Sequence, residues 1–440
     1  MQKGVYLLLG LVLLGRLLVS TVVFHSDILC QAGWGNYIYS NGGTGFYENP
    51  VWIFSWPNHP PLMSLMYGAE KWLYWQLIWV IPRLANGLYT VFPLEIFRGF
   101  YVWGTNFEAL VSPEIPFEQG YLFTMKLLSI LADMLIGVLL YSIAKKKTKK
   151  PLAWPLVYWL SPFSWYVSSL WGQTDSLAYL FVLTSFLLIP KNFWGSLLSL
   201  WLAVSLKPTA VLVVPLFLVI WPMVGLKLKS FLMGAVLVTG LTLAYVIPFS
   251  AKQNPLQYSM ETVVKKVFYR AEFRLTTNSY NFWHIFTLDK AYNQNQLFFG
   301  VSGKLWGLML FAGCYFLAIK KLKKGISQEA IFSALFIVSA GGWLFLTNML
   351  ERYYYMGVVT GLIITIWNPK LFRPWLLMSL IFWLNLFRHW WYPGFLWPVR
   401  WALTAGNYWA GLPLSLVNAG LYVWFCWSLI KNDSLRVKSL

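Results

Sequence analysis

Charged residues are scarce in this sequence of 440 residues. Only 11% are Asp, Glu, Lys or Arg, whereas 58% are hydrophobic. Soluble domains carry about 25% charged residues, so the composition argues against a soluble protein. Apolar runs recur instead, each near the roughly 20 residues that a helix needs to span a bilayer. The sequence therefore predicts an all-α integral membrane protein.

Cysteine is rare as well. The three cysteines, Cys30, Cys314 and Cys426, lie far apart and show no CxxC spacing. This pattern is not that of a disulfide framework or of a thiolate metal site. The first apolar run continues to Phe24 without a small-x-small cleavage site, so we expect a helix there and not a signal peptide.

Acidic residues are few: 15, against 34 Lys and Arg, which gives a formal charge of +19. The lysines do not cover one domain face but fall in short clusters between apolar runs, and residues 145–150 contain five of them. The positive-inside rule expects such clusters in cytoplasmic loops. We therefore expect membrane lipid as a partner and no nucleic acid.

The alternation of apolar runs with basic clusters predicts about 12 membrane spans, with both termini in the cytoplasm. The predicted spans are 5–24, 121–144, 152–170, 176–189, 194–206, 209–224, 230–248, 301–319, 330–346, 353–367, 375–386 and 412–430. Residues 1–440 would form one polytopic domain in the cell membrane. Its first external loop, 25–120, mixes charged and aromatic residues, which favours interfacial helices. Residues 250–300 would form the second large external loop.

The segment from Phe24 to Pro61 interrupts the apolar pattern just after the first span. It contains Asp27, Glu48 and His59 among glycines and aromatic residues. A carboxylate just beyond a membrane helix can stay near the bilayer, be partly desolvated and act as a base. The simpler alternative is that Asp27 only ends its helix by meeting water.

The remaining external charges point to a site on the same face. The carboxylates Asp27, Glu48, Asp175 and Glu351 map to external ends of spans, together with Lys207 and Arg352. Each also has a structural alternative. Asp175 can cap the next helix, Lys207 can snorkel to the interface, and Glu351 can pair with Arg352. Inside the bilayer, Lys126 and Asp133 share one helical face; we expect a structural bond for Asp133, because a charge there is costly and usually paired.

Several short motifs occur in order along the chain. They are the Asp after the first span, HPPL (His59 to Leu62), KLLSILADM (Lys126 to Met134), WGQTD (Trp171 to Asp175), SLKPTAV (Ser205 to Val211), NSYNFW (Asn278 to Trp283) and ERY (Glu351 to Tyr353). The set resembles the polytopic GT-C glycosyltransferases, and is most similar to prokaryotic relatives of the mannosyltransferase that adds the second mannose to GPI anchors. The resemblance covers roughly residues 5 to 390. The chain departs from the family patterns YPPL, LKPQ and HERY at His59, Thr209 and Leu350.

The resemblance implies a GT-C-like helix bundle that moves a sugar, expected to be a hexose such as mannose, from a polyprenyl-phosphate donor. The acceptor would be a glycan, glycolipid or protein at the outer membrane face. Asp27 would be the general base of an inverting displacement, and Arg352 and Lys207 would bind the phosphate. The matched motifs add His59 and Gln173 on the donor side. For substrate binding they suggest Asp175, Glu351, Glu48, Tyr353 and Asn281.

Two other classes remain open at this stage. A secondary transporter or lipid flippase would show inverted repeats and charges near the membrane midplane, whereas no convincing halves are visible. A noncatalytic lipid-binding scaffold would not need this set of charges on one side. No cofactor is expected. A divalent metal between Asp27 and either Glu48 or Asp175 is not favoured, because no DxD pair is present.

The predicted sidedness is testable with single cysteines. Cysteines at Asn41, Asn254 and Asn407 should react with an impermeant thiol reagent on intact cells, because all three lie in external loops, whereas one at Thr148 should not. Labelling at Thr148 would contradict the topology and the external site with it.

Overall fold

A computed structural model describes the chain except for residues 1, 22, 49–54, 96–97, 99–118, 252, 269–272, 289, 409 and 432–440. The described part is almost entirely helical. Its two short strands, β1 (Leu297–Phe298) and β2 (Val301–Ser302), form an antiparallel hairpin.

Five of the described helices are long and apolar enough to cross a membrane: α5 (Gln119–Ala144), α11 (Leu228–Ser250), α15 (Gly303–Lys323), α16 (Gln328–Phe345) and α20 (Gly411–Lys431). Shorter apolar helical segments lie at Tyr6–Ser20, Asp175–Leu188, Phe193–Leu206 and Pro208–Met223. These features agree with an all-α membrane protein, and the number of spans stays a prediction.

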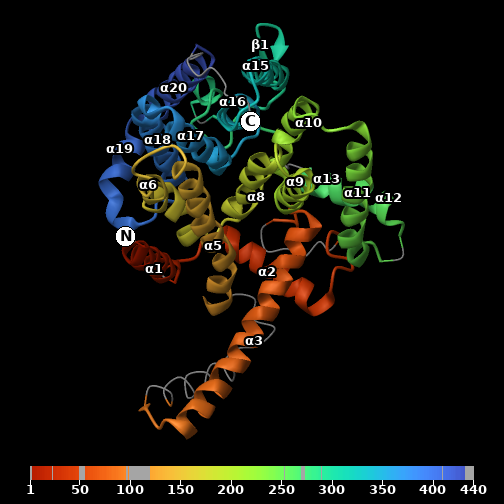
Figure 1. The fold of residues 1–440 in the computed structure, drawn as a ribbon, viewed down its shortest axis with the longest axis vertical. Helices are drawn as coiled ribbons and strands as arrows, with labels where there is room; N and C mark the ends of the chain where they lie inside the picture. Colours follow the sequence, from red (N-terminus) through yellow and green to blue (C-terminus); the bar gives the residue numbers. More distant parts are fainter. Residues whose placement is uncertain are drawn as a thin grey trace.

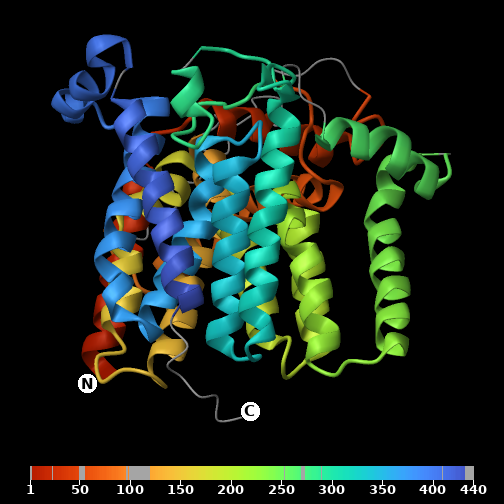
Figure 2. The same cartoon turned by 90° about the horizontal axis from the view of Figure 1, so that it is seen from above.

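The basic clusters gather at one edge of the bundle. In Figure 2 the start of α1 (Gln2–Ser20) and the end of α20 lie at the lower edge. The connections from α5 to α6 (Ala153–Trp159), from α10 (Val214–Met223) to α11, and from α15 to α16 lie there too. These connections contain Lys145–Lys150, Lys227 and Lys324. The hairpin, α12 (Pro255–Tyr258) and α13 (Val264–Phe268) lie at the opposite edge.

The first polar loop contains α2 (Ser26–Asn41) and one long helix, α3 (Pro61–Val91). Figure 1 shows α3 projecting from the body of the molecule, and in Figure 2 it runs along the viewing direction, across the bundle helices. A helix in the membrane interface has this orientation relative to spanning helices. Most of the remainder of the predicted loop, up to residue 118, lies outside the described residues.

The predicted span 152–170 is not one continuous helix. The structure divides this segment into α6, α7 (Pro162–Ser164) and a π-helix, η1 (Trp165–Trp171). Ser161 is extended, with ψ of 128°, because the residue before a proline is disfavoured in the helical region. The π-helix ends at Gly172, whose φ of 82° is a left-handed value that favours glycine. The break places WGQTD at the end of a π-helix, a geometry that is frequent at functional sites. The predicted span 209–224 likewise begins with a 3₁₀ turn, η2 (Pro208–Val213), before α10.

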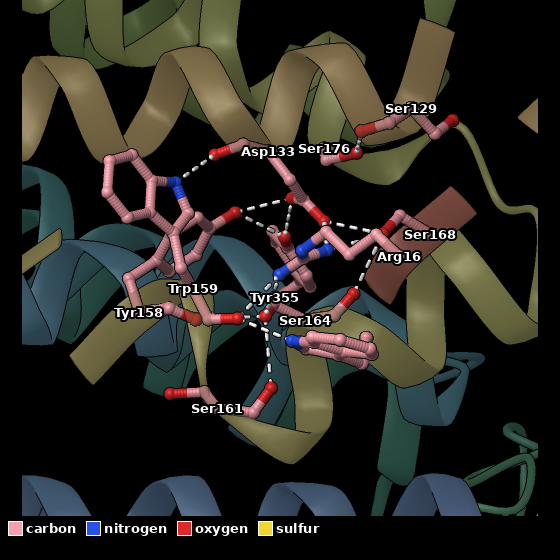
Figure 3. Close-up of polar contacts among 11 residues, drawn as sticks. Arg16, Ser129, Asp133, Tyr158, Trp159, Ser161, Ser164, Ser168, Ser176 and Tyr355 are labelled. Atoms are coloured by element: carbon pink, nitrogen blue, oxygen red, sulfur yellow. Dashed lines mark hydrogen bonds and ion pairs between the residues drawn. The ribbon is translucent and has the colours of Figure 1, made fainter. Parts of the chain in front are cut away.

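A fully buried ion pair joins the first helix to the rest of the bundle (Figure 3). Arg16 Nη1 lies 2.8 Å from Asp133 Oδ2, and both side chains are 0% exposed. The hydroxyls of Tyr158 and Tyr355 both donate to Asp133 Oδ1, each at 2.5 Å. The structural bond expected for Asp133 is therefore present. Its partner, Arg16, lies inside the first apolar run and was not considered from the sequence.

The guanidinium of Arg16 has several further acceptors. Its Nη2 donates to Ser164 Oγ at 2.7 Å and to the Trp159 carbonyl at 3.1 Å, while Nη1 also donates to Ser168 Oγ at 3.1 Å. The network thus connects α1, α5, α6, α7, η1 and α17 (Tyr355–Trp367).

We expect Arg16→Leu to lower the free energy of unfolding by about 3–5 kcal/mol, because it leaves the Asp133 carboxylate buried without a counter-ion. Adding Asp133→Asn should recover part of the loss, since the remaining amide is neutral. Thermal unfolding of the purified protein in detergent measures both. Leu14→Ala, at a side chain of the same helix that is 52% exposed, is the matched control, and equal stability of Arg16→Leu and this control would contradict the expectation.

Candidate functional site

The site is built around the first turn of α2. His25 caps this helix: its ring Nδ1 accepts the Asp27 backbone N–H at 3.0 Å. Figure 2 shows α2 near the edge opposite the basic clusters. The Asp27 carboxylate therefore stands at the polar end of the bundle, and its side chain is 27% exposed.

Three side chains from distant parts of the chain meet the Asp27 carboxylate at one oxygen. Oδ2 accepts from Gln173 Nε2 at 2.7 Å and from Trp171 Nε1 at 3.2 Å, and Arg352 Nη1 lies at 3.5 Å. The WGQTD and ERY segments are thus brought to the carboxylate as the sequence predicts for a shared site. Gln173, expected on the donor side, orients the carboxylate itself.

Arg352 lies in a 3₁₀ turn, η4 (Glu351–Tyr354), and bridges two carboxylates. The Nη1 that faces Asp27 also lies 3.2 Å from Glu351 Oε1, so the local ion pair expected for ERY forms. The guanidinium carbon is 5.3 Å from the centre of the Trp171 ring and 5.7 Å from that of Tyr353. These contacts fix the plane of the guanidinium between two aromatic faces.

The second cation of the site is Lys207, which follows the last residue of α9 (Phe193–Leu206). Its ammonium forms a buried ion pair with Asp175, the first residue of α8 (Asp175–Leu188). The ammonium also lies 5.8 Å from the centre of the Tyr353 ring, which the Arg352 guanidinium contacts from its own position. Tyr353 thus connects the two cations. Lys207 does not simply snorkel, because its side chain is 5% exposed and paired.

Several buried polar atoms of the same segments have no hydrogen-bond partner among the described residues. They include Gln173 Oε1, Thr174 Oγ1, Asp175 Oδ1, Glu351 Oε2 and Arg352 Nε. Folded proteins leave few such atoms, and those that occur need an explanation. In the WGQTD and ERY segments these atoms belong to residues beside the Asp27 carboxylate and the two cations, so they are candidates for contact with a polar ligand.

Three of the predicted site residues have other surroundings. The His59 ring Nδ1 lies 2.8 Å from the Tyr67 hydroxyl, and its ring meets Trp34 edge-on at 5.4 Å. Glu48 is exposed near Tyr258 of α12, whose pKa is raised by burial and then by this carboxylate. The side-chain Oδ1 of Asn281 accepts hydrogen bonds from the backbone N–H groups of residues 283 and 284. Asn281 therefore organises its own turn, because its hydrogen bonds are used within that segment and with the Trp343 carbonyl.

The structure adds aromatic residues that the sequence did not single out. The His389 ring stacks on Trp171 at 5.2 Å, and the His25 ring lies 4.6 Å from Trp171 and 4.9 Å from Trp390. His389 and Trp390 end α18 (Phe372–Trp390). Only their place in a Trp-rich external loop could have indicated them, and 27 tryptophans in the chain made that signal weak.

The charges around Asp27 set its protonation. Burial alone raises the pKa of this carboxyl, but Arg352, followed by His25 and His389, outweighs burial and the pKa lies below its ordinary value. Burial lowers the pKa of His25 to about 4, against the opposing effect of Asp27, so the His25 ring is neutral at pH 7. Burial lowers the pKa of Lys207 to about 8 although Asp175 raises it. The site thus has an ionised carboxylate beside two cations at neutral pH.

Comparison with known proteins adds no relative from which roles can be transferred. No family model matches this chain, and no curated protein matches its sequence.

The lowered pKa of His25 predicts a specific pH dependence of stability. Between about pH 6.5 and pH 4 the unfolded chain binds a proton at this histidine and the folded chain resists it, so stability falls as the pH drops through that window. His25→Asn should remove this part of the loss, because asparagine can still cap α2 but does not titrate. The measurement is the difference in thermal unfolding temperature between pH 7 and pH 5. An equal drop in mutant and wild type would contradict it.

Proposed function

We propose that this chain is a membrane glycosyltransferase with a GT-C-like bundle of about 12 spans. It moves a sugar, in the simplest case a hexose such as mannose, from a polyprenyl-phosphate donor to an acceptor at the outer membrane face. Asp27 is the general base. The observation that carries the proposal is the Asp27–Arg352 contact: Arg352 Nη1 lies 3.5 Å from Asp27 Oδ2, and the Asp27 side chain is 27% exposed.

The chemistry of sugar transfer from a lipid phosphate needs a base and a cation close together. Asp27 takes the proton of the acceptor hydroxyl, and the acceptor oxygen attacks the anomeric carbon. The bond between that carbon and the phosphate oxygen breaks on the opposite face, so the configuration inverts. Because the pKa of Asp27 lies below its ordinary value, the carboxylate is ionised at neutral pH, which is the form that can accept a proton.

The leaving phosphate needs a cation with a free donor. Arg352 uses Nη1 for both of its carboxylate contacts, whereas its Nε–H has no partner among the described residues. A guanidinium edge of this kind can bind a phosphate through two parallel hydrogen bonds. Lys207, held near the same Tyr353 ring, supplies a second positive charge.

An apolar groove beside Lys207 fits the polyprenyl chain of the donor. The groove has a volume of about 380 Å³ and lies between α9, η2 with α10, and α11. Its lining includes Trp201, Phe217 and Tyr245, and reaches Ser205, two residues before Lys207. A lipid tail in this groove would bring its phosphate end to the Lys207 side of the site.

Asp27→Asn is the direct test of the base. It keeps the size of the side chain but cannot take the proton, so we expect turnover to fall by about a hundred- to ten-thousand-fold. Purified protein is incubated with a panel of radiolabelled polyprenyl-phosphate sugars, and the lipid and carbohydrate products are extracted.

Glu48→Gln is the matched control, because Glu48 is an exposed carboxylate of the same loop outside the Asp27 contacts, and it should retain turnover. Folded Asp27→Asn within about threefold of wild type would refute the base assignment. Movement of labelled lipid across vesicles without any product would favour a flippase or transporter instead.

A further inference from the structure

Lys126 has a buried ammonium surrounded by backbone carbonyls, and the proposed chemistry gives this residue no role. It lies on α5 and its side chain is 0% exposed. Its ammonium lies within hydrogen-bonding distance of four backbone carbonyls, which share its three N–H donors: Ser20 at 3.0 Å, Val23 at 2.6 Å, Ser169 at 3.1 Å and Leu170 at 2.8 Å. Within the described residues it forms no ion pair with a carboxylate.

The four carbonyls lie at or just after the C-terminal ends of two helices. Ser20 is the last residue of α1 and Val23 follows it, whereas Ser169 and Leu170 lie in the last turn of η1. Carbonyls at helix C-termini have no intrahelical partner and carry partial negative charge. One buried ammonium therefore satisfies two helix ends at once and ties them to α5.

Both of these ends lead directly into the site. Asp27 follows Val23 by four residues, and Trp171 and Gln173 follow Leu170 by one and three. These three residues make the hydrogen bonds at Asp27 Oδ2. The ammonium thus holds both the segment that contains the acceptor, Asp27, and the segment that contains the donors, Trp171 and Gln173.

The packing next to Lys126 gives independent support. A Cβ added to Gly172 would lie 3.1 Å from Lys126 Cγ and 2.6 Å from Ile28 Cδ1, and the φ of Gly172 is +82°. The Lys126 stem therefore lies directly under the turn between Trp171 and Gln173, against α2.

We propose that Lys126 is a positioning residue, a cationic clamp that sets the Asp27 segment and the Trp171–Gln173 segment at hydrogen-bonding distance. The inference rests on the proposed function for its catalytic consequence, but the clamp itself is a structural claim that can be tested without turnover.

The structural arm uses a cysteine pair, Asp27→Cys with Gln173→Cys, in a background where the three buried cysteines are replaced by alanine. A short bifunctional thiol reagent should bridge the pair. Lys126→Met, which keeps the straight chain and removes the charge, should lower the bridging yield at least fivefold. Lys145→Met, at an exposed residue directly after the end of the same helix, should leave it unchanged.

The catalytic arm uses Lys126→Met with Asp27 and Gln173 intact. We expect kcat to fall at least tenfold and the acid limb of the kcat/KM profile to move to higher pH. The shift follows because a loosened Asp27 loses part of the influence of Arg352, His25, His389 and Lys207. A role in folding alone would reduce the yield of protein without moving that limb.

Unchanged bridging and an unchanged acid limb in folded Lys126→Met would overturn the clamp. If Lys126→Met cannot be recovered folded, Lys126→Gln is judged by the same two measurements, since its amide keeps part of the donors. Absence of turnover in the wild type with every donor would refute the proposed function, while the bridging result would still decide the clamp.

Discussion

The buried ion pair between Arg16 and Asp133 is the contact on which the rest of the described bundle depends. Two charges removed from water in a membrane bundle are stable only when their remaining hydrogen-bonding capacity is used. Here two tyrosine hydroxyls, two serines and a carbonyl surround the pair. The pair and these partners come from six different elements, so the network holds those elements in one arrangement.

This arrangement also determines where the site forms. Arg16 lies eleven residues before Asp27 on the same segment, and Tyr355, which donates to Asp133, lies three residues after Arg352. Asp27 and Arg352, which contact each other in the site, therefore both lie close in sequence to residues of the same buried network. Nearer the polar edge, Lys126 joins α1 to the π-helix that leads into Trp171 and Gln173. Rigid support of this kind is what the proposed general base would need, because a misplacement of about an ångström can cost around a hundredfold in rate.

The electrostatics of the site follow from how its charges alternate. One set of ion pairs joins Arg352 to both Asp27 and Glu351. A second ion pair joins Lys207 to Asp175. Tyr353 lies between the two cations. Each cation is paired with a carboxylate, while Arg352 Nε and Gln173 Oε1 have no hydrogen-bond partner among the described residues. Because the Asp27 side chain is partly exposed, a ligand can reach its carboxylate from outside the bundle.

The part of the site that could be predicted is the part whose signal is local. Asp27, Asp175 and Arg352 break apolar runs at their ends, and the hydropathy pattern alone assigns such positions to one face. Glu48 fits the same hydropathy pattern and Asn281 lies in a motif, yet neither contacts Asp27 in the part of the chain that the structure describes. A position on one face of the bundle does not give the distance between two residues within that face. Arg16 was missed because a single arginine hardly changes the mean hydropathy of its run.

The sequence by itself determined the class of the protein, the positions of most helices and the face on which charges gather, since these depend on composition and on short-range periodicity. Only the tertiary structure decided that 152–170 breaks at a π-helix, that Asp133 pairs with Arg16, and that Asp27 meets Gln173 and Arg352. Each of these depends on which residues distant in the chain come together. That choice is made by satisfying buried charges and backbone carbonyls in three dimensions, for which no linear pattern carries the information.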